Sequence, residues 1–443
     1  MSGHGGSGGA FQRFFRSEVS GSIVLLAATV LALAWANSPW AASYFELQHT
    51  YIGVSWGDAS FKLSLQHWIN DGLMVVFFFV VGLEIKRELV VGQLSSMRKA
   101  FGPVAAALGG MVVPAALYLV FNGGTEAARG WGVPMATDIA FALGILALFG
   151  ARAPIGLKVF LTALAIADDI GAVLVIALFY TEKVRILALV VAGVLLLLLA
   201  AANRARLRPP GLYILLALGV WAAVFASGVH ATVAGILVAF VVPVRARIEP
   251  REYLARLRRA SGELDALEDS LTRVSMLSET QQLDLLDDVY HSTGDMIPSG
   301  IALEHFLHPL QAFIILPLFA LFNAGVALNA EMLAMPPDRL TLGVIAGLFV
   351  GKQVGVMLFT WLAVKSGRAS RPEGVSWPMI YGVSCLAGVG FTMSLFISEL
   401  AFTGTMASEA KIGILAGSLV AGIWGYLVLS RALRGSGVGT AVS

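Results

Sequence analysis

Long apolar runs separated by short polar segments dominate the pattern of the 443-residue chain. A helix needs about 20 apolar residues to cross the hydrocarbon core of a bilayer. The pattern therefore predicts an all-α polytopic membrane protein with about twelve transmembrane helices, several of them short or broken. The expected spans lie near residues 20–38, 66–85, 102–121, 131–149, 156–178, 185–203, 210–225, 228–243, 304–328, 343–364, 378–400 and 410–430.

The polar segments divide the chain into five parts. Its first ten residues, MSGHGGSGGA, are rich in glycine and serine, as flexible tails are. We therefore expect a disordered cytoplasmic amino terminus, eight transmembrane helices, a charged helical cytoplasmic insert, four further transmembrane helices and a cytoplasmic tail. The expected bounds of these parts are 1–19, 20–248, 249–303, 304–430 and 431–443.

Two of the polar segments have patterns of their own. In the insert, Leu257, Leu264 and Leu271 recur at seven-residue spacing, which predicts an amphipathic helix or a helical hairpin. A solvated connector is the alternative. Residues 44–65 alternate apolar and polar positions around Gly57-Asp58, which favours a β-hairpin that could pair strands between protomers. An irregular loop fits that segment equally well.

Composition and charge narrow the class of protein. Hydrophobic residues make up 57% of the chain and charged residues 13%, whereas soluble domains carry about 25% charged residues. The formal net charge of +2 gives no basis for binding nucleic acid. The single cysteine, Cys385, excludes an internal disulfide and a cysteine metal cage.

The positive residues predict the orientation in the membrane. If the amino terminus is cytoplasmic, 23 of the 30 lysines and arginines fall in inside segments and six in outside segments. Positive residues concentrate in cytoplasmic loops. Both termini are therefore expected in the cytoplasm, and Lys352 remains inside a span.

Two adjacent carboxylates, Asp168 and Asp169, lie near the centre of the apolar run LTALAIADDIGAVLVIALFYT. A charge at the bilayer midplane costs about 2.5 to 3.5 kcal/mol, so such groups face a protein interior or an aqueous cavity. Adjacent helical residues point about 100° apart, so the two side chains cannot share one direction. The pair is the starting hypothesis for function.

Two spans contain interruptions at similar places. WGVPMATDIAF sets Pro134 just ahead of Thr137 and Asp138, and CLAGVGFTMS sets two glycines beside Thr392. Proline removes a helix hydrogen bond, and a freed backbone group at membrane depth must be satisfied by protein or a cavity. Broken helices in separated three-helix units indicate inverted-topology repeats with a site where the breaks meet. Close helix packing is the alternative role of the glycines.

Lys352 is a lone ammonium in the span LFVGKQVGVMLF. A buried lysine loses its proton or requires a carboxylate partner. The residues leave Asp138, Asp168 and Asp169 as candidate partners. Snorkelling to an interface is the weaker alternative, because apolar or small residues flank Lys352 on both sides.

Other titratable side chains have less specific signals. Asp71 begins the second span, where it marks a helix end or acts at an outer mouth. Glu84 and Glu88 share one face at the other end of that helix, where a solvated helix end is the default. His230 could titrate near neutral pH, although a lone histidine is more often a structural hydrogen-bonding group.

Seven stretches together resemble the NhaA family of bacterial sodium/proton antiporters. They are NDGLMVVFFFVVGLEIKREL, PMATDIAFALGILAL, ALAIADDIGAVLVIALFYT, SGVHATVAGILVAF, LEHFLHPLQAFIILPLFALFNAGV, GKQVG and GFTMSLFISELAF. The resemblance runs from about Asn70 to Tyr426. It implies the NhaA fold, which is itself a known case of inverted repeats with two discontinuous helices. It also implies a homodimer in the bacterial inner membrane.

The resemblance implies roles for individual residues. Asp169 would be the main Na⁺ ligand and proton carrier, and Asp168, a second Na⁺ ligand, would pair with Lys352. Thr137 and Asp138 would compensate the ends of the broken helices. The candidates for pH regulation are Glu84, Arg87, Glu88, Glu304, His308 and His230, and the outer-side aspartate is Asp71. The long insert departs from the family pattern and puts pH sensing near Glu304 in doubt.

The expected function is secondary active antiport, in which Na⁺ or Li⁺ leaves in exchange for more than one imported proton. A desolvated carboxyl binds either a proton or a hard cation, so the two substrates compete for one group. Alternating access then couples their movements without a cofactor. The expected physiological role is pH-regulated control of sodium and pH.

Three other classes of protein are alternatives. A sodium-coupled solute symporter of related fold is the nearest alternative, but the apolar wall around the aspartates offers few groups for an organic anion. An intramembrane aspartyl protease would need its carboxylates to converge from different helices, and the chain lacks a GxGD stretch. A passive channel would conduct without a counter-ion. The expected protein is not an enzyme.

Overall fold

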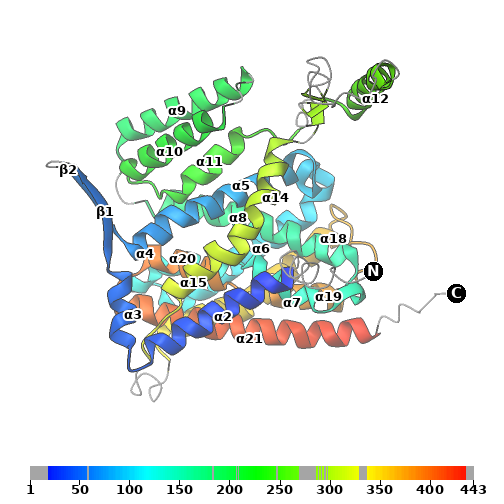
Figure 1. Ribbon diagram of the computed structural model, residues 1–443. Coiled ribbons are helices and arrows are strands. Elements are labelled where there is room, and N and C mark those ends of the chain that lie inside the picture. Colours follow the sequence, from blue (N-terminus) through cyan, green and yellow to red (C-terminus); the bar gives the residue numbers. More distant parts are fainter. Residues whose placement is uncertain are drawn as a thin grey trace, which may run out of the picture.

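The computed structural model describes residues 18–56, 59–181, 184–205, 207, 209–245, 248–268, 286, 287, 289, 290, 292, 293, 296, 298–328 and 337–435. Within this part, nine helices are long and apolar enough to cross a bilayer, and one bent pair makes a tenth. Two shorter apolar helices, Gly211–Ser227 and Thr232–Val241, occupy the places of the seventh and eighth expected spans. The predicted all-α membrane fold is confirmed (Figure 1).

The helices pack as two groups. The group that we call the pocket bundle contains α6 (Met97–Asn122), η3 (Glu126–Met135), α7 (Ile139–Ala147), α8 (Ile155–Phe179), α17 (Arg339–Ala346), η6 (Gly347–Gly351), α18 (Lys352–Lys365), α19 (Trp377–Leu386), α20 (Phe391–Ala401) and α21 (Thr405–Gly435). The flanking bundle contains α2 (Glu18–Ala36), α4 (Leu65–His67), η1 (Trp68–Leu73), α5 (Met74–Val90), α9 (Ile186–Arg204), α10 (Pro210–Ser227), α11 (Thr232–Val241), α14 (Ser299–Leu310), η5 (Gln311–Ile315) and α15 (Leu316–Asn323). Short turns η2 (Gln93–Ser95) and η4 (Gly150–Arg152) join helices of these groups. The bundles meet where α2 packs on α7, α5 on α8 and α15 on α20.

The two three-helix units of the pocket bundle run in opposite directions. The end of α6 meets the start of α17, since Asn122 lies against Gly343, and the start of α6 lies near the chain that follows α18. Gly109 on α6 and Gly355 on α18 face each other so closely that a Cβ on either would overlap the other's carbonyl oxygen. Small residues let transmembrane helices approach in this way. The antiparallel contact brings the breaks of the two units together.

A β-hairpin projects from one side of the bundle (Figure 1). Strand β1 (Tyr51–Trp56) pairs antiparallel with β2 (Ala59–Ser64), so the predicted hairpin is confirmed and its Gly57-Asp58 turn lies outside the described residues. We call this the hairpin side, and we call the side where α2 begins and α21 ends the terminal side.

The hairpin is shorter than the alternating pattern suggested, because α3 (Ala41–Gln48) takes up its first residues. Tyr44 and Gln48, one helical turn apart, both face the end of α15. The Tyr44 hydroxyl donates to the Leu321 carbonyl at 2.7 Å, and Gln48 Nε2 donates to the Phe322 carbonyl at 2.6 Å. Burial raises the pKa of Tyr44 to about 12, so the phenol keeps its donor proton at physiological pH.

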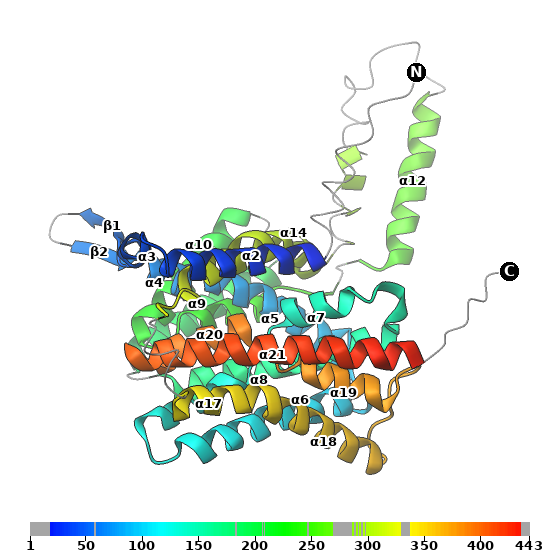
Figure 2. The same cartoon turned by 90° about the horizontal axis from the view of Figure 1, so that it is seen from below.

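The charged insert contains a helix that stands away from the bundle (Figure 2). The helix is α12 (Pro250–Glu268), as its amphipathic pattern predicts. The chain returns beside it, since the Tyr253 hydroxyl lies 3.1 Å from the Thr293 hydroxyl and Arg256 donates to Ser292 at 3.5 Å. Leu271 and most of the acidic half of the insert lie outside the described residues.

Candidate functional site

Two helix breaks cross in the middle of the pocket bundle. The first separates η3 from α7 at residues 136–138, and the second separates α19 from α20 at residues 387–390, where the helix bends by 43°. The Asp138 amide donates to the Val389 carbonyl at 2.6 Å, which fastens one break to the other. A Cβ on Gly390 would lie only 3.0 Å from the Ala136 carbonyl oxygen, so glycine suits the crossing. The predicted interruptions are therefore present and in contact.

Asp138 caps the amino-terminal ends of both half-helices. Its Oδ1 accepts from the Phe141 amide of α7 at 3.0 Å. Its Oδ2 accepts from the Thr392 amide of α20 at 3.0 Å and from the Thr392 hydroxyl. The positive ends of two helix dipoles thus meet one buried carboxylate, which stabilises its negative charge. Both oxygens of Asp138 are occupied by these helix ends.

The start of α20 has a second capping residue, which sequence reasoning missed. The Ser418 hydroxyl on α21 accepts from the backbone amides of Gly390 and Phe391, both at 3.2 Å. The unpaired amides at the start of a half-helix need such partners when they are buried. The only signal in the sequence is a serine within an apolar span, and such serines are too common to indicate a capping role.

Lys352 is paired with Asp168 in the interior of the protein. Its Nζ lies 2.5 Å from Asp168 Oδ2, and the two side chains are 0% and 1% exposed. The Thr137 hydroxyl lies 2.6 Å from the same carboxylate oxygen and 2.9 Å from Lys352 Nζ. Lys352 is the first residue of α18 after the π-helical turn η6. The three side chains form one hydrogen-bonded cluster, as a buried ion pair requires.

Asp169 has no such compensation. The residue is 2% exposed, and its Oδ1 is buried without a hydrogen-bond partner in the described part of the chain. Oδ1 of the neighbouring Asp168 is also buried without a partner there. An ionised carboxylate buried without a partner is very costly, so this group must carry a proton or bind a cation. Carboxylate oxygens are the ligands that hard cations prefer.

The expected pH-regulating residues lie mostly in one cluster on the terminal side. Arg87 of α5 is ion-paired with Glu304 of α14 and lies 3.6 Å from Glu88. A carboxylate oxygen of Glu88 also accepts from the backbone amide of Gln93 at 2.7 Å. Glu84 lies one turn before Glu88 on α5, and His308 lies one turn after Glu304 on α14.

Two other expected residues lie on the hairpin side: His230, a candidate for pH regulation, and Asp71, the expected outer-side aspartate. A ring nitrogen of His230 lies 2.7 Å from the Tyr180 carbonyl oxygen, which fits the structural alternative for this histidine. Asp71 lies in the π-helical turn η1, where its backbone carbonyl accepts from Trp221 Nε1 at 3.0 Å. Of the expected pH-regulating residues, His230 therefore lies apart from the terminal-side cluster.

Tyr180, on the hairpin side, links the end of α8 to η3, the first half of the first broken helix. Its hydroxyl donates to the Arg129 carbonyl at 2.8 Å and accepts from the Gly132 amide at 3.3 Å. Burial raises the pKa of Tyr180 to about 12, so this phenol stays neutral over the physiological range. The link between α8 and η3 is therefore insensitive to pH.

Comparison with known proteins places these features in a family. A family model described as Na⁺/H⁺ antiporter 1 matches residues 12–429. The chain is similar to the Na⁺/H⁺ antiporter NhaA of Oleidesulfovibrio alaskensis, with 48% identity over 427 residues that cover 96% of this chain and 94% of the relative. It is similar to NhaA of Acidithiobacillus ferrooxidans, with 48% identity over 96% of this chain and 98% of the relative. NhaA of Koribacter versatilis is 46% identical over 95% of this chain and 91% of the relative.

Proposed function

The chain belongs to the Na⁺/H⁺ antiporter 1 family, and we propose that it exports Na⁺ or Li⁺ in exchange for protons. The observation that carries the proposal is the buried carboxylate of Asp169, which lacks a counter-charge beside the compensated pair of Asp168 and Lys352. Asp169 is the substrate-binding group in this proposal. Asp168 Oδ1, which is also unpaired, supplies the second oxygen for the ion.

Competition at Asp169 couples the two substrates. A proton neutralises the buried carboxyl, and Na⁺ neutralises the buried carboxylate, but one group cannot hold both. Either loaded form removes the cost of an uncompensated charge, whereas the empty ionised form retains it. Movement between the two sides is therefore favoured only when Asp169 is loaded, and this makes exchange obligatory.

Lys352 provides the second exchangeable proton. When Na⁺ draws Asp168 toward the ion, Lys352 loses its carboxylate partner and the buried ammonium becomes costly. Release of its proton removes that cost. Two protons, one from Asp169 and one from Lys352, then move against one Na⁺, so transport carries net charge and the membrane potential drives sodium export.

Alternating access would use the division into two bundles. The breaks, Asp138 and the ion site all belong to the pocket bundle, whereas α5 and α15 of the flanking bundle cover it. A displacement of the pocket bundle against the flanking bundle would open the site to one side at a time. Asp138 would keep the two half-helices together during that movement, because it caps both.

Regulation by pH would act at the terminal side. Glu84, Glu88 and Glu304 lie near a single arginine, Arg87, so the cluster holds more negative than positive charge. Protonation of Glu84 and Glu88 at low pH relieves their repulsion of Glu304, so the Arg87–Glu304 ion pair that joins α5 to α14 remains without a competing charge. We therefore propose that the cluster favours a resting form in acid and releases it as pH rises.

The orientation and assembly complete the proposal. The protein lies in the bacterial inner membrane. Its terminal side faces the cytoplasm, because most lysines and arginines belong to segments on that side. The protein forms a homodimer through the projecting hairpin, whose outer strand edge has no partner strand among the described residues. Exposed strand edges readily pair with a second chain.

The decisive experiment replaces Asp169 with asparagine, which keeps the size of the side chain and removes its charge. We expect Asp169→Asn to abolish sodium-dependent proton movement in inside-out vesicles, measured by fluorescence dequenching, because the variant can exchange neither substrate.

The matched control is Asp338→Asn, the same change at the amino-terminal cap of α17, where the aspartate accepts from the Thr341 amide at 2.6 Å and asparagine also caps. The control should exchange normally. Normal exchange by Asp169→Asn would refute the assignment.

A further inference from the structure

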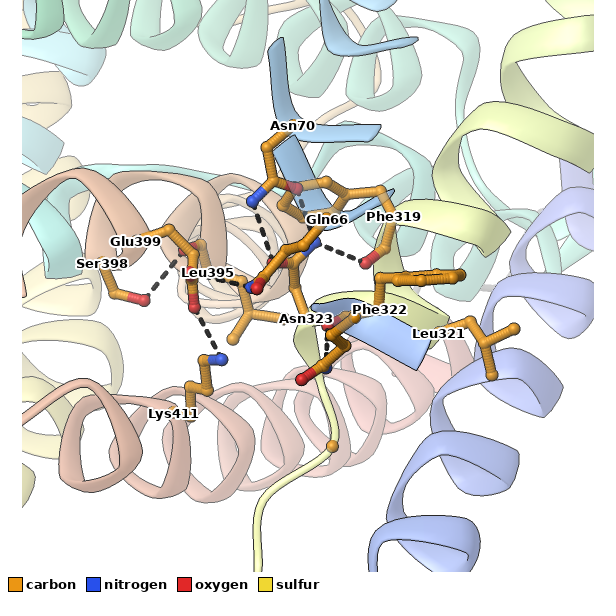
Figure 3. A network of polar contacts seen from close by, with 12 residues as sticks. Gln66, Asn70, Phe319, Leu321, Phe322, Asn323, Leu395, Ser398, Glu399 and Lys411 are labelled. Atoms are coloured by element: carbon orange, nitrogen blue, oxygen red, sulfur yellow. Dashed lines mark hydrogen bonds and ion pairs between the residues drawn. The ribbon is translucent and has the colours of Figure 1, made fainter. Parts of the chain in front are cut away.

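A second polar network lies on the hairpin side, outside the ion site (Figure 3). We call it the hairpin-side network. Its side chains come from both bundles, and none of them takes part in the function proposed above. Its members are Gln66 on α4, Asn70 on η1, Asn323 on α15, Glu399 on α20 and Lys411 on α21.

The flanking-bundle half of the network is a rigid pair of amides. Asn70 Nδ2 donates to Asn323 Oδ1 at 3.1 Å, and Asn323 Nδ2 donates back to Asn70 Oδ1 at 2.8 Å. Asn323 is 0% exposed and also donates to the Phe319 carbonyl at 2.9 Å. The reciprocal bonds fasten the π-helical turn η1 to the end of α15.

The pocket-bundle half is an ion pair. Lys411 Nζ lies 2.6 Å from Glu399 Oε1, and their side chains are 11% and 19% exposed. The pair fastens α20 to α21. Each half of the network therefore belongs to one bundle and is held firmly within it.

One amide joins the two halves. Gln66 Nε2 lies 3.4 Å from Asn323 Oδ1 and 3.3 Å from Glu399 Oε2, and the second of these contacts crosses between the bundles. The neighbouring contacts across the boundary are aromatic. The centroid of the Phe396 ring of α20 lies 5.3 Å from that of Phe78 of α5 and 6.2 Å from that of Phe319 of α15. Ring contacts separate without leaving polar atoms unpaired, whereas the Gln66 contact must be broken.

The contact is mechanically connected to the ion site. Glu399 lies seven residues after Thr392 on α20, which is about 10 Å along a helix. Thr392 binds Asp138 at the other end of this half-helix. Because both residues belong to one short helix, a contact that holds Glu399 also restrains Thr392 at the crossing of the two breaks.

We propose that the hydrogen bond from Gln66 to Glu399 is a latch that keeps the hairpin side of the ion pathway closed. The latch sets the proportion of molecules open to that side, because a bond present in only one of two forms shifts their populations. At 3.3 Å the contact is long, and therefore weak enough to break in every transport cycle. The inference rests on the proposed alternating access, and it adds a control of that movement that no residue of the ion site provides.

A labelling experiment tests the latch. Phe396→Cys in a Cys385→Ser background places one thiol at the boundary, and the native Cys385 is buried in any case. A membrane-impermeant maleimide is applied to proteoliposomes from each side in turn, with and without Gln66→Leu. We expect Gln66→Leu to raise the labelling rate from the hairpin side by about three- to tenfold, as loss of one hydrogen bond allows. The control is Gln93→Leu, the same change at an exposed residue on the terminal side, which should leave the rate unchanged.

The outcomes separate the latch from the transport function. Unchanged labelling in Gln66→Leu overturns the latch, whatever the transport result. Should Gln66→Leu fail to fold, Gln66→Glu keeps the size of the side chain and sets two carboxylates together; it must then raise the labelling rate, and an unchanged rate again overturns the proposal. Exchange measured in parallel with Asp169→Asn reports on the ion site alone, so normal exchange there refutes the proposed function without affecting the labelling result.

Discussion

Among the described residues, two lysine–carboxylate pairs have nearly the same geometry in different surroundings. Lys352 and Asp168 are 2.5 Å apart and 0% and 1% exposed, whereas Lys411 and Glu399 are 2.6 Å apart and 11% and 19% exposed. Both pairs join helices of the pocket bundle. The first lies beside an uncompensated carboxylate, and the second lies in a network of neutral amides.

The difference shows that the desolvation of an ion pair, and not the distance between its charges, decides how strongly each charge depends on the other. A fully buried pair makes each charge depend on the other, so removal of one partner leaves the other in a medium that cannot solvate it. A pair with access to water can lose one partner and recover solvation. The deep pair can therefore be coupled to an ion, while the hairpin-side pair serves to hold helices together.

The largest expected effect comes from Lys352→Met, which keeps the apolar stem and removes the charge. We expect the free energy of unfolding in micelles to fall by about 3 to 5 kcal/mol, because Asp168 is left as an unpaired buried charge. Exchange should show a changed pH profile. The double variant Asp168→Asn/Lys352→Met should recover most of the lost stability, and a simple sum of the two single losses would contradict a coupled pair.

A smaller effect is expected from tightening the helix contact that supports the deep pair. Gly355→Ala places a methyl group against the Gly109 carbonyl and pushes α18, which carries Lys352, away from α6. We expect a loss of about 1 to 3 kcal/mol in the free energy of unfolding, the usual cost of overpacking.

The matched variant lies on α21, the helix that carries Lys411 of the other pair. At Gly413 an added Cβ would lie 3.0 Å from the Thr341 carbonyl oxygen and from the Val344 side chain, so Gly413→Ala should cost less. Equal thermal midpoints for the two alanine variants would show that the α6–α18 contact is not specially tight.

The smallest effect is expected from Lys411→Met, the same substitution as in the deep pair. The free energy of unfolding should fall by only about 1 kcal/mol, because the Glu399 side chain is 19% exposed and its Oε2 still accepts from Gln66. Sodium-dependent proton movement in vesicles should persist. A loss as large as that of Lys352→Met would remove the distinction between the two pairs.

The sequence predicted much of the architecture for simple physical reasons. Apolar run length located the spans, and Pro134 with the two glycines before Thr392 located the breaks, because the bilayer permits few other arrangements. The alternating pattern fits a hairpin and an irregular loop equally well, and it suggests too early a start for the hairpin, because the first residues of the pattern form the helix α3. The insert helix α12 followed from heptad spacing.

The candidate site was predicted less completely. The residues alone left three aspartates as possible partners of Lys352, and the structure selects Asp168 because Asp138 is occupied by two helix ends. The hairpin-side network was missed altogether. Its residues are far apart in the chain, and a glutamine before a span or an asparagine after one carries no pattern of its own.

The sequence by itself determined that this chain spans the membrane many times and buries charge there, since both properties follow from the transfer cost of side chains. Only the tertiary structure decided which buried charges compensate each other and which one, Asp169, is left over. Pairing depends on distances between residues from different helices, and those distances arise when the two opposed units pack together. The same packing decided that Gln66 meets Glu399 at the boundary between the bundles.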